Sequence, residues 1–520
     1  MKIYALSMDR NLVAIGFRRI VSYAKSKGFS VKSIFFLDNI FEASFAGSWW
    51  KQKTDEGFTV NYVKNYEAID KLAEKISSAD VVALSLMSVQ RNIAKRLCLL
   101  LKEFNPNIKI IIGGYHPTIF PEDAITFSDV ICLGEGENVF VEFLKRVKSG
   151  ENILNIPNTW ARKGDEIIKN ERIPVMTEEE MEKMPFMDYS LNESYVFSYA
   201  QGILGKLTKD ILIRHVGTTY NTIWSVGCPY KCSFCSQSKF IDLDKAYAKY
   251  RGPSPDYIIA EIREVQKNYP LDYVIFYDSN FLGRDIKELR EFAEKFKREI
   301  GLKFILSGTN PVSITYDKMQ ILNDGGLVRI KMGFESANDN ILRIFKRPTT
   351  VKHLENALNI LSKFRGKMVI PSLEMILDNP YETNEDLYQT IDFLDKAPGP
   401  FTISLFSLQF MPGTDLSQKV NDYNLIEEQM EKEYMFSYKP TAINNFASIF
   451  AIFKPPHFLV RWIRKMITGK EEKLYPNLKN FLYKTMLVRR ALNQARYGDY
   501  STFPYWTMIA YHKYRNIFGR

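Results

Sequence analysis

Cysteine and histidine are scarce in this chain, which has five of each among its 520 residues. Because Cys228, Cys232 and Cys235 fall within eight residues, the cysteines do not suggest a disulfide framework, and the cluster is typical of a metal site. Cys98 lies in a predicted helix and Cys132 in a predicted strand, so we expect both to be ordinary buried thiols. A second cluster would need more cysteines than remain, which excludes most proteins that hold several clusters.

Long hydrophobic runs are also missing. No stretch approaches the ~20 apolar residues of a membrane-spanning helix, and the longest candidate, 446–460, is interrupted by Lys454 and two prolines. The first residues do not combine a basic stretch with an apolar one, so no signal peptide is predicted. We therefore expect a cytoplasmic protein. The apolar fraction of 46% is ample for a buried core, which argues against disorder.

Hydrophobic periodicity divides the chain into four predicted regions. Residues 1–150 alternate apolar strands with amphipathic helices, which predicts an α/β fold with a doubly wound, Rossmann-like parallel sheet. Residues 151–209 lose this periodicity and are predicted to be a connector. Residues 210–420 repeat βα units and predict a partial (β/α) barrel, whose chemistry sits at the carboxyl ends of its strands. Residues 421–520 are predicted to be helical and basic.

The three clustered cysteines follow a predicted strand at 222–227, so their thiols share a loop at the carboxyl end of a strand. Three thiolates can hold three irons of a [4Fe-4S] cluster and leave the fourth iron open to chelate the amino and carboxylate groups of a substrate. A closed cluster or a zinc site would need a fourth thiolate or a histidine nearby. The nearest histidine, His215, is expected on the preceding strand and not at ligand spacing.

The spacing Cys228-x3-Cys232-x2-Cys235, with Phe234 before the last cysteine, resembles the signature of the radical SAM superfamily. The resemblance implies that a reduced [4Fe-4S] cluster on these cysteines cleaves S-adenosylmethionine (SAM) into methionine and a 5′-deoxyadenosyl radical. It also implies that Phe234 lines the adenine side of SAM. An external donor such as a flavodoxin or ferredoxin would supply the electron.

Later predicted strand ends resemble further blocks of the same superfamily. The segment 277–281 resembles the Asp-Asp-x-Phe block beside the SAM methionyl group, 307–310 the block near the ribose and carboxylate, and 333–336 the Gly-x-Glu-Ser block. Residues 411–414 resemble the closing Pro-Gly-Thr block. The resemblance thus assigns SAM contacts to Asp278, Ser307, Asn310, Glu335 and Ser336. One block departs, because 377–383 lacks both glycines of the Gly-x-Pro-Gly-Glu-Thr that relatives often carry.

Glycines and polar residues at the strand ends of residues 1–150 resemble the cobalamin-binding subgroup of radical SAM enzymes. Glycine there would let a flat corrin approach the backbone. No Asp-x-His-x-x-Gly motif occurs, so a histidine-ligated cobalt is not implied. The alternative is a domain that serves as a scaffold without a corrin. The resemblance assigns the corrin contacts to Ser88, Gly113, Gly114, Tyr115, His116, Gly134 and Glu135.

These features favour a cobalamin-dependent radical SAM methyltransferase that acts on an unactivated carbon of a small-molecule or lipid-like substrate. Radical cyclisation, rearrangement or oxidation on the same scaffold, with or without cobalamin, is the first alternative. A membrane- or nucleic-acid-binding protein with a structural cluster is a more distant one. Nucleic acid is not expected as a partner, since no RNA-binding module is evident after residue 420.

Positive charge gathers near the end of the sequence. Residues 454–520 carry a net charge of +11, whereas the whole chain carries +10. Helical spacing predicts that Leu459, Trp462, Ile463 and Met466 share one face, flanked by Arg461, Arg464 and Lys465. A basic, aromatic helix of this kind favours peripheral contact with an anionic membrane or with a lipid-like substrate. The alternative is a helix packed on the barrel with its basic side in solvent.

Overall fold

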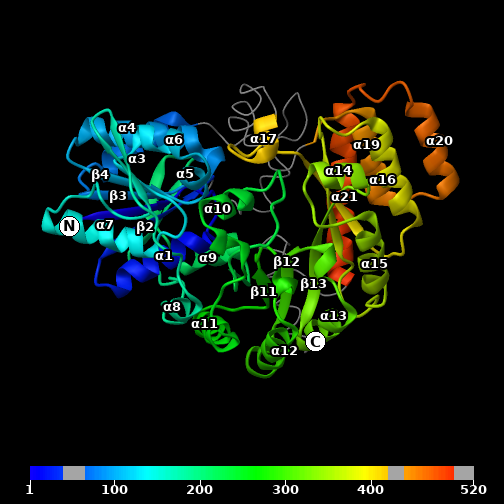
Figure 1. Cartoon of the computed structure of the whole chain (residues 1–520), viewed down its shortest axis with the longest axis horizontal. Helices are drawn as coiled ribbons and strands as arrows, with labels where there is room; N and C mark the ends of the chain where they lie inside the picture. The colour runs from blue at the N-terminus through cyan, green and yellow to red at the C-terminus, as the bar shows by residue number, and fades with distance from the viewer. Residues whose placement is uncertain (39–64, 420–437, 497–520) are drawn as a thin grey trace.

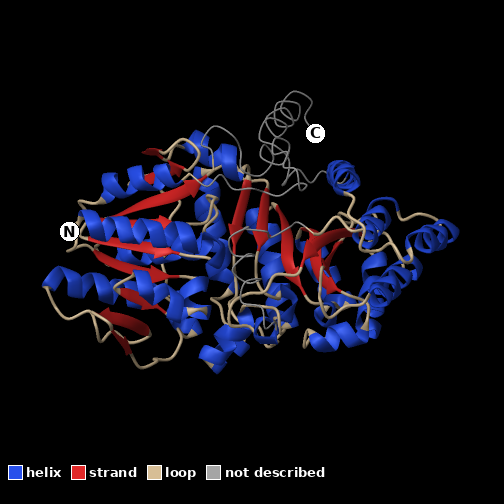
Figure 2. Ribbon diagram, turned by 90° about the horizontal axis from the view of Figure 1, so that it is seen from above, coloured by secondary structure: helices blue, strands red, loops and turns tan. Residues whose placement is uncertain are grey.

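The structure is a computed structural model, which describes residues 1–38, 65–419 and 438–496. Two sheets lie side by side, each flanked by helices (Figures 1 and 2). Their parallel strands are largely apolar because helices cover both faces of the first sheet and the outer face of the second. The α/β fold predicted from the periodicity is confirmed.

The first sheet has nine strands in the order β7-β6-β5-β4-β3-β1-β2-β8-β9. The strand order reverses at β1, which lies between β2 and β3, and ligands of doubly wound sheets bind outside such a point. The strands are β1 (Ile3–Ser7), β2 (Val31–Leu37), β3 (Val81–Ser85), β4 (Lys109–Gly113), β5 (Val130–Cys132), β6 (Thr159–Lys163), β7 (Glu166–Lys169), β8 (Ser194–Ser198) and β9 (Ile203–Lys206). The helices of this part are α1 (Ile15–Ser26), α3 (Tyr66–Ile76), α4 (Arg91–Phe104), α5 (Tyr115–Ile119), α6 (Pro121–Ala124) and α7 (Glu137–Ser149).

Residues 151–209, expected to be a connector, contribute four strands to the first sheet. β6 and β7 form an antiparallel hairpin on the β5 edge, and β8 pairs parallel to β2 with β9 antiparallel beside it. The edge strands β7 and β9 are short and largely exposed, so they carry little hydrophobic periodicity for the pattern to detect. The helices α8 (Glu178–Glu182) and α9 (Lys209–Val216) complete this segment. His215 therefore lies in a helix and not, as expected, on a strand.

The second sheet has six parallel strands in sequential order, β10 to β15, as expected for an open (β/α) barrel. The strands are β10 (Thr219–Thr222), β11 (Tyr273–Phe276), β12 (Lys303–Thr309), β13 (Leu327–Glu335), β14 (Ser372–Leu377) and β15 (Thr402–Ser407). The helices are α10 (Gln237–Leu243), α11 (Pro255–Asn268), α12 (Ile286–Lys295), α13 (Tyr316–Gly325), α14 (Asp339–Ile344), α15 (Val351–Ser362), α16 (Asn384–Lys396) and α17 (Asp415–Lys419).

Three helices form the described part of the C-terminal region: α19 (Ala442–Phe453), α20 (His457–Ile467) and α21 (Pro476–Arg496). Phe446 and Phe450 of α19 are buried in the same apolar core as the outer face of the second sheet. The region is helical, as predicted, and it packs on the barrel through α19 and α16. Every helix in the described ranges is too short or too polar to span a membrane.

Candidate active site

The cysteine loop follows β10 and is held on both sides by backbone hydrogen bonds. Val226 pairs with Arg251 in an antiparallel bridge, and the Cys228 amide donates to the Tyr247 carbonyl at 2.9 Å. These bonds tie the loop to the segment that follows α10. The thiols therefore sit at the carboxyl end of the second sheet, where the sequence placed them.

Asp278 fixes the start of this loop. The Asp278 carboxylate accepts hydrogen bonds from the Trp224 amide at 3.0 Å and from the amide and hydroxyl of Ser225, both at 2.6 Å. The residue is 1% exposed, and burial raises the pKa of its carboxyl group. The sequence assigned Asp278 to a direct SAM contact, whereas its oxygens are taken up by the loop. This geometry favours a positioning role.

The three thiols share one electrostatic environment. Burial raises the pKa of Cys232 and raises that of Cys235 to about 12, and the charges of Cys228 and Cys232 raise the pKa of Cys235 further. The guanidinium of Arg347 opposes these shifts at all three cysteines, and its Nη1 lies 3.9 Å from the Cys232 sulfur. Arg347 was missed by the sequence analysis. It lies in the loop after α14 and belongs to no motif quoted there.

Arg347 also meets Glu335. Its Nη1 lies 3.5 Å from the Glu335 carboxylate, and its Nη2 donates to the Gly333 carbonyl at 2.6 Å. Glu335 has a left-handed backbone (φ 62°), a strained conformation for a residue with a side chain and one that often marks functional sites. Burial raises the pKa of Glu335 to about 7, although Arg347 lowers it. A carboxyl group that can change protonation near neutral pH thus lies next to the thiols.

The other residues assigned to SAM lie at the ends of β12 and β13. Asn310 caps the turn after β12 and accepts from the Thr349 hydroxyl at 3.2 Å, which links the strand end to the loop that carries Arg347. Ser336 is buried and lies 3.3 Å from a Glu382 oxygen. Ser307 is partly buried at the carboxyl end of β12. The structure therefore brings these strand ends to one edge of the sheet.

Two further features of this edge bear on the predictions. Phe234 is partly buried against Phe345, with ring centroids 5.0 Å apart. In the segment 377–383, Asp378 stands where relatives often have the first glycine of Gly-x-Pro-Gly-Glu-Thr. Its backbone takes the left-handed conformation (φ 59°), which glycine adopts readily. Its carboxylate accepts from Ser407 at 2.8 Å and from Asn444 at 2.7 Å, and these bonds support the turn. Aspartate is among the residues that tolerate this conformation.

At the edge of the first sheet, the polar side chains predicted to contact the corrin form hydrogen bonds within the protein. His116 is fully buried, with Nδ1 3.1 Å from the Ser88 hydroxyl and Nε2 2.9 Å from Asp123. Both ring nitrogens and the Ser88 hydroxyl are thus engaged. A Cβ on Gly114 would lie 2.9 Å from the Leu86 backbone, so this glycine serves close packing between strand ends. A Cβ on Gly113 would meet only the Cys132 side chain, at 3.8 Å.

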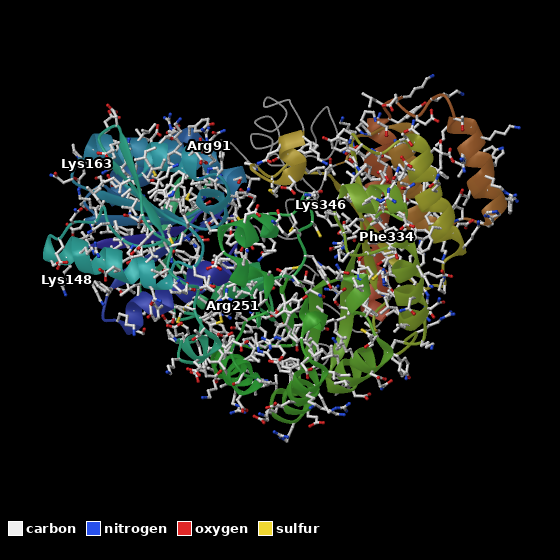
Figure 3. All side chains as sticks on the ribbon, in the orientation of Figure 1. Arg91, Lys148, Lys163, Arg251, Phe334 and Lys346 are labelled. Carbon is white, nitrogen blue, oxygen red and sulfur yellow. The ribbon has the colours of Figure 1, made fainter. Side chains whose placement is uncertain are left out.

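Gly134 and Glu135 join the two sheets. The Glu135 amide donates a hydrogen bond to the Tyr247 hydroxyl at 3.1 Å, and the Glu135 carboxylate forms a 2.6 Å ion pair with Arg251. Arg251 is labelled at the junction of the two halves in Figure 3. A Cβ on Gly134 would lie 2.6 Å from the Tyr247 hydroxyl. These residues secure the cysteine segment to the first sheet.

Tyr115 lies at the same junction. Its ring packs edge-on against Phe240 of α10 at 5.2 Å, and the side chain is 41% exposed. Burial raises the pKa of the Tyr115 phenol, and the negative charges of Cys235 and of Asp9, which follows β1, raise it further. Burial raises the pKa of Asp9 itself to about 6. Asp9 was also missed, although its place after the first strand was a signal that could have found it.

The cysteine set fits an iron–sulfur cluster better than a single ion. Within the described ranges, no three His, Cys, Asp or Glu side chains converge closely enough to hold one metal ion. The three thiols nevertheless lie close enough to shift one another's pKa. In a cubane each thiolate binds a different iron, so a wider spacing is expected.

Comparisons with known proteins agree with this arrangement. The radical SAM superfamily profile matches residues 222–394, and the B12 binding domain profile matches residues 51–144. The chain is 24% identical over 398 residues to an anaerobic magnesium-protoporphyrin IX monomethyl ester cyclase of Rubrivivax gelatinosus, covering 72% of this chain and 66% of the cyclase. It is 22% identical to the cobalamin-dependent radical SAM methyltransferase TokK of Streptomyces tokunonensis, covering 69% of this chain and 51% of TokK.

Among solved structures, the fold resembles the cobalamin-dependent SAM radical enzyme OxsB with aqua-cobalamin and SAM bound. The TM-score is 0.61 at 16% identity, over 95% of this chain and 72% of OxsB. The [4Fe-4S] cluster, SAM and cobalamin expected from the sequence are the cofactors of these two domains. The chain therefore carries a radical SAM domain preceded by a B12 binding domain.

Proposed function

We propose that this protein methylates an unactivated carbon of a small-molecule or lipid-like substrate, using SAM at a [4Fe-4S] cluster together with cobalamin. When bound, the cluster supplies the electron that cleaves SAM to a 5′-deoxyadenosyl radical, and cobalamin supplies the methyl group. A cytoplasmic flavodoxin or ferredoxin is the class of reductant that suits such a cluster. The chain spans 66% of the cyclase and 51% of TokK.

The observation that carries the proposal is the meeting of the two sheet edges. Tyr115, after β4, packs on Phe240 just beyond the cysteine loop, and Asp9 and Cys235 both act on its phenol. The carboxyl end of each sheet is where a ligand binds in such folds. Two cofactors held there would face one another across a short gap. A methyl transfer that needs a radical and a methyl donor at one carbon requires this proximity.

Residues at the carboxyl end of the second sheet would have different roles in binding the cluster and SAM. Cys228, Cys232 and Cys235 would hold three irons, and Arg347 would stabilise the negative charge of the thiolates. Glu335 would accept hydrogen bonds from a SAM amine or hydroxyl. Asp278 would fix the cysteine loop from beneath. Phe234, Ser307, Asn310 and Ser336 would shape the remaining wall.

The first sheet would receive the corrin mainly by shape. A Cβ at Gly113 would meet only the Cys132 side chain, at an ordinary contact distance, whereas Ser88, His116 and Glu135 are engaged in bonds within the protein. Backbone and Tyr115 would therefore form the contact surface. Because His116 lies buried with both nitrogens engaged, the corrin would bind without a histidine ligand from this loop.

Radical cyclisation is the second candidate, and the similarity to the magnesium-protoporphyrin cyclase favours it. The two outcomes leave different products, since methyl transfer adds one methyl group and cyclisation removes hydrogen without adding carbon. The cofactor set cannot separate them, but the mass of the product can.

The test is an anaerobic incubation of protein reconstituted with iron, sulfide and hydroxocobalamin, with dithionite and SAM that carries a deuterated methyl group. We expect 5′-deoxyadenosine, and a product from a candidate extract that has gained the labelled methyl. A Cys235→Ala variant is the matched control. Deoxyadenosine with a product that lacks the label would favour cyclisation or oxidation. Intact cluster without deoxyadenosine under any reductant would contradict the radical reaction.

A further inference from the structure

Helix α20 carries a row of large apolar side chains that the protein leaves uncovered. Phe458, Trp462 and Met466 follow one another at intervals of four residues, so they form one stripe along the helix. Their exposed fractions are 68%, 56% and 52%. Single exposed apolar residues are ordinary, but a continuous stripe on one helix indicates a contact surface.

The opposite side of α20 packs against the core of the second half and against α16. Val460 is buried in the core of the second half, and Ile463 packs against the same core. Arg464 forms ion pairs with Glu385 at 2.8 Å and Asp392 at 3.1 Å, both on α16. His457 is paired with Asp395, which also lies on α16. The predicted face of Leu459, Trp462, Ile463 and Met466 was thus rotated: Ile463 points inward, and Phe458 takes its place on the outer side.

Basic residues flank the stripe on its solvent side. Arg461 and Lys465 are exposed, each one position before an apolar residue of the stripe, and neither forms an ion pair with a described residue. No acidic residue occurs in α20, and residues 454–496 carry eleven Lys and Arg against two Asp and Glu. In Figure 1, α20 lies at the side of the molecule away from the first sheet, and Figure 3 shows its side chains projecting outward.

We infer that this face of α20, defined by Phe458, Trp462 and Met466 with Arg461 and Lys465, docks on an anionic membrane surface. Charge complementarity identifies the occupant. Aromatic and aliphatic side chains enter the interface between headgroups and acyl chains, while arginine and lysine remain among the phosphates. The helix is about 16 Å long and would lie in the plane of the membrane. The docking is independent of the reaction proposed above.

The same features argue against other occupants. A second copy would set Arg461 and Lys465 of both molecules against one another, without an acidic partner on the helix. A nucleic acid would favour cations as the outermost groups, whereas the centre of this face is apolar. An anionic bilayer satisfies both the cations and the stripe.

The experiment uses the full-length protein and vesicles of phosphatidylcholine, alone or mixed with phosphatidylglycerol, in a sedimentation assay. We expect binding to the mixed vesicles at low salt, little binding to phosphatidylcholine alone, and release at high salt because surface charges are then screened. Each basic residue at an anionic surface contributes about fivefold to binding. The double variant Arg461→Glu/Lys465→Glu should therefore weaken binding at least about 25-fold.

Apolar variants test the stripe separately. Phe458→Ser/Trp462→Ser/Met466→Ser should weaken binding at least about tenfold, because each side chain loses its transfer into the interface. The matched controls are Leu99→Ser and Lys148→Glu, exposed residues of the first half, which should bind as the wild type does. Thermal unfolding of every variant should match the wild type. Trp462→Phe should sediment normally but lose part of the blue shift of tryptophan fluorescence on binding.

Four outcomes would overturn the inference. Equal binding to neutral and anionic vesicles would mean that docking does not depend on anionic lipid. No binding at low salt would remove the membrane as occupant. Self-association lost in the triple serine variant would identify a second copy instead. A salt-sensitive shift of RNA that the charge variant abolishes, without vesicle binding, would identify a nucleic acid.

Discussion

The carboxyl-end edges of the two sheets are built in different ways. At the second sheet, charged groups remain at the edge: Glu335 in a left-handed conformation, and Arg347 between it and the Cys232 thiol. At the first sheet, Ser88 and His116 are bonded to one another inside the protein. We propose that the second edge binds a charged ligand and that the first receives a flat one by shape. Motif resemblance located both edges but could not separate these two kinds of site.

The largest expected effect concerns the charged edge. Changing Cys228, Cys232 or Cys235 to Ala should abolish the reconstituted cluster of about four irons and its visible absorption. Each cysteine is one of only three protein ligands, so the loss of one is not compensated by another. Cys98→Ala and Cys132→Ala should keep it, since both thiols are buried in the first half and burial raises the pKa of each. Iron content and absorption provide the measurement. Cluster loss in a folded Cys132→Ala variant would contradict the assignment.

The second prediction separates shape from packing at the first edge. Gly113→Val should fold and lose cobalamin in gel filtration, because its side chain would occupy space beyond the end of β4. Gly114→Val should lose folded protein altogether, since its Cβ would lie 2.9 Å from the Leu86 backbone and its φ is +102°. Circular dichroism distinguishes the two. Full cobalamin retention by Gly113→Val would mean that the corrin does not use this edge.

The third prediction tests the ion pair at the charged edge. Arg347→Gln should destabilise the protein by about 3 kcal/mol, since it leaves the buried Glu335 carboxylate without its partner. The double variant Arg347→Gln/Glu335→Gln should recover part of this loss. Arg347→Gln should also lower the reduction potential of the cluster, because a positive charge beside the thiolates is removed. The control is Arg343→Gln on the exposed side of α14. An unchanged potential, measured by EPR-monitored titration, would reduce Arg347 to a structural role.

The sequence predicted the second sheet better than its surroundings. The cysteine spacing is a local signal, and the strands β10 to β15 are apolar enough to be recognised without their partners. Arg347 could not be found in this way, because it reaches the thiols only after the chain has passed through three more strands. The bonding of His116 was equally hidden, since Asp123 follows in a separate short helix.

The edges of the first sheet show a different limit. The hairpin β6–β7 carries a turn signal at Gly164-Asp165 that would have revealed it, had the polar strands on either side been weighed. β8 gave no such signal, because its parallel pairing with β2 joins residues far apart in sequence. Local patterns therefore located the motifs, whereas the tertiary structure determines which side chains remain available to a ligand.

The smallest expected effect concerns Asp9, a carboxyl group at the edge of the first sheet whose pKa is raised. Burial raises that pKa from 3.8 to about 6, so the folded state favours the protonated acid. This contribution to stability is fully present below about pH 4 and is lost as the pH rises through 6. Asp9→Asn should therefore stabilise the cofactor-free protein by about 2 kcal/mol at pH 8 and leave it unchanged at pH 4. Denaturant unfolding at the two pH values measures the difference, with Asp80→Asn as an exposed control. Equal effects at both pH values would mean that folding does not raise the pKa of Asp9.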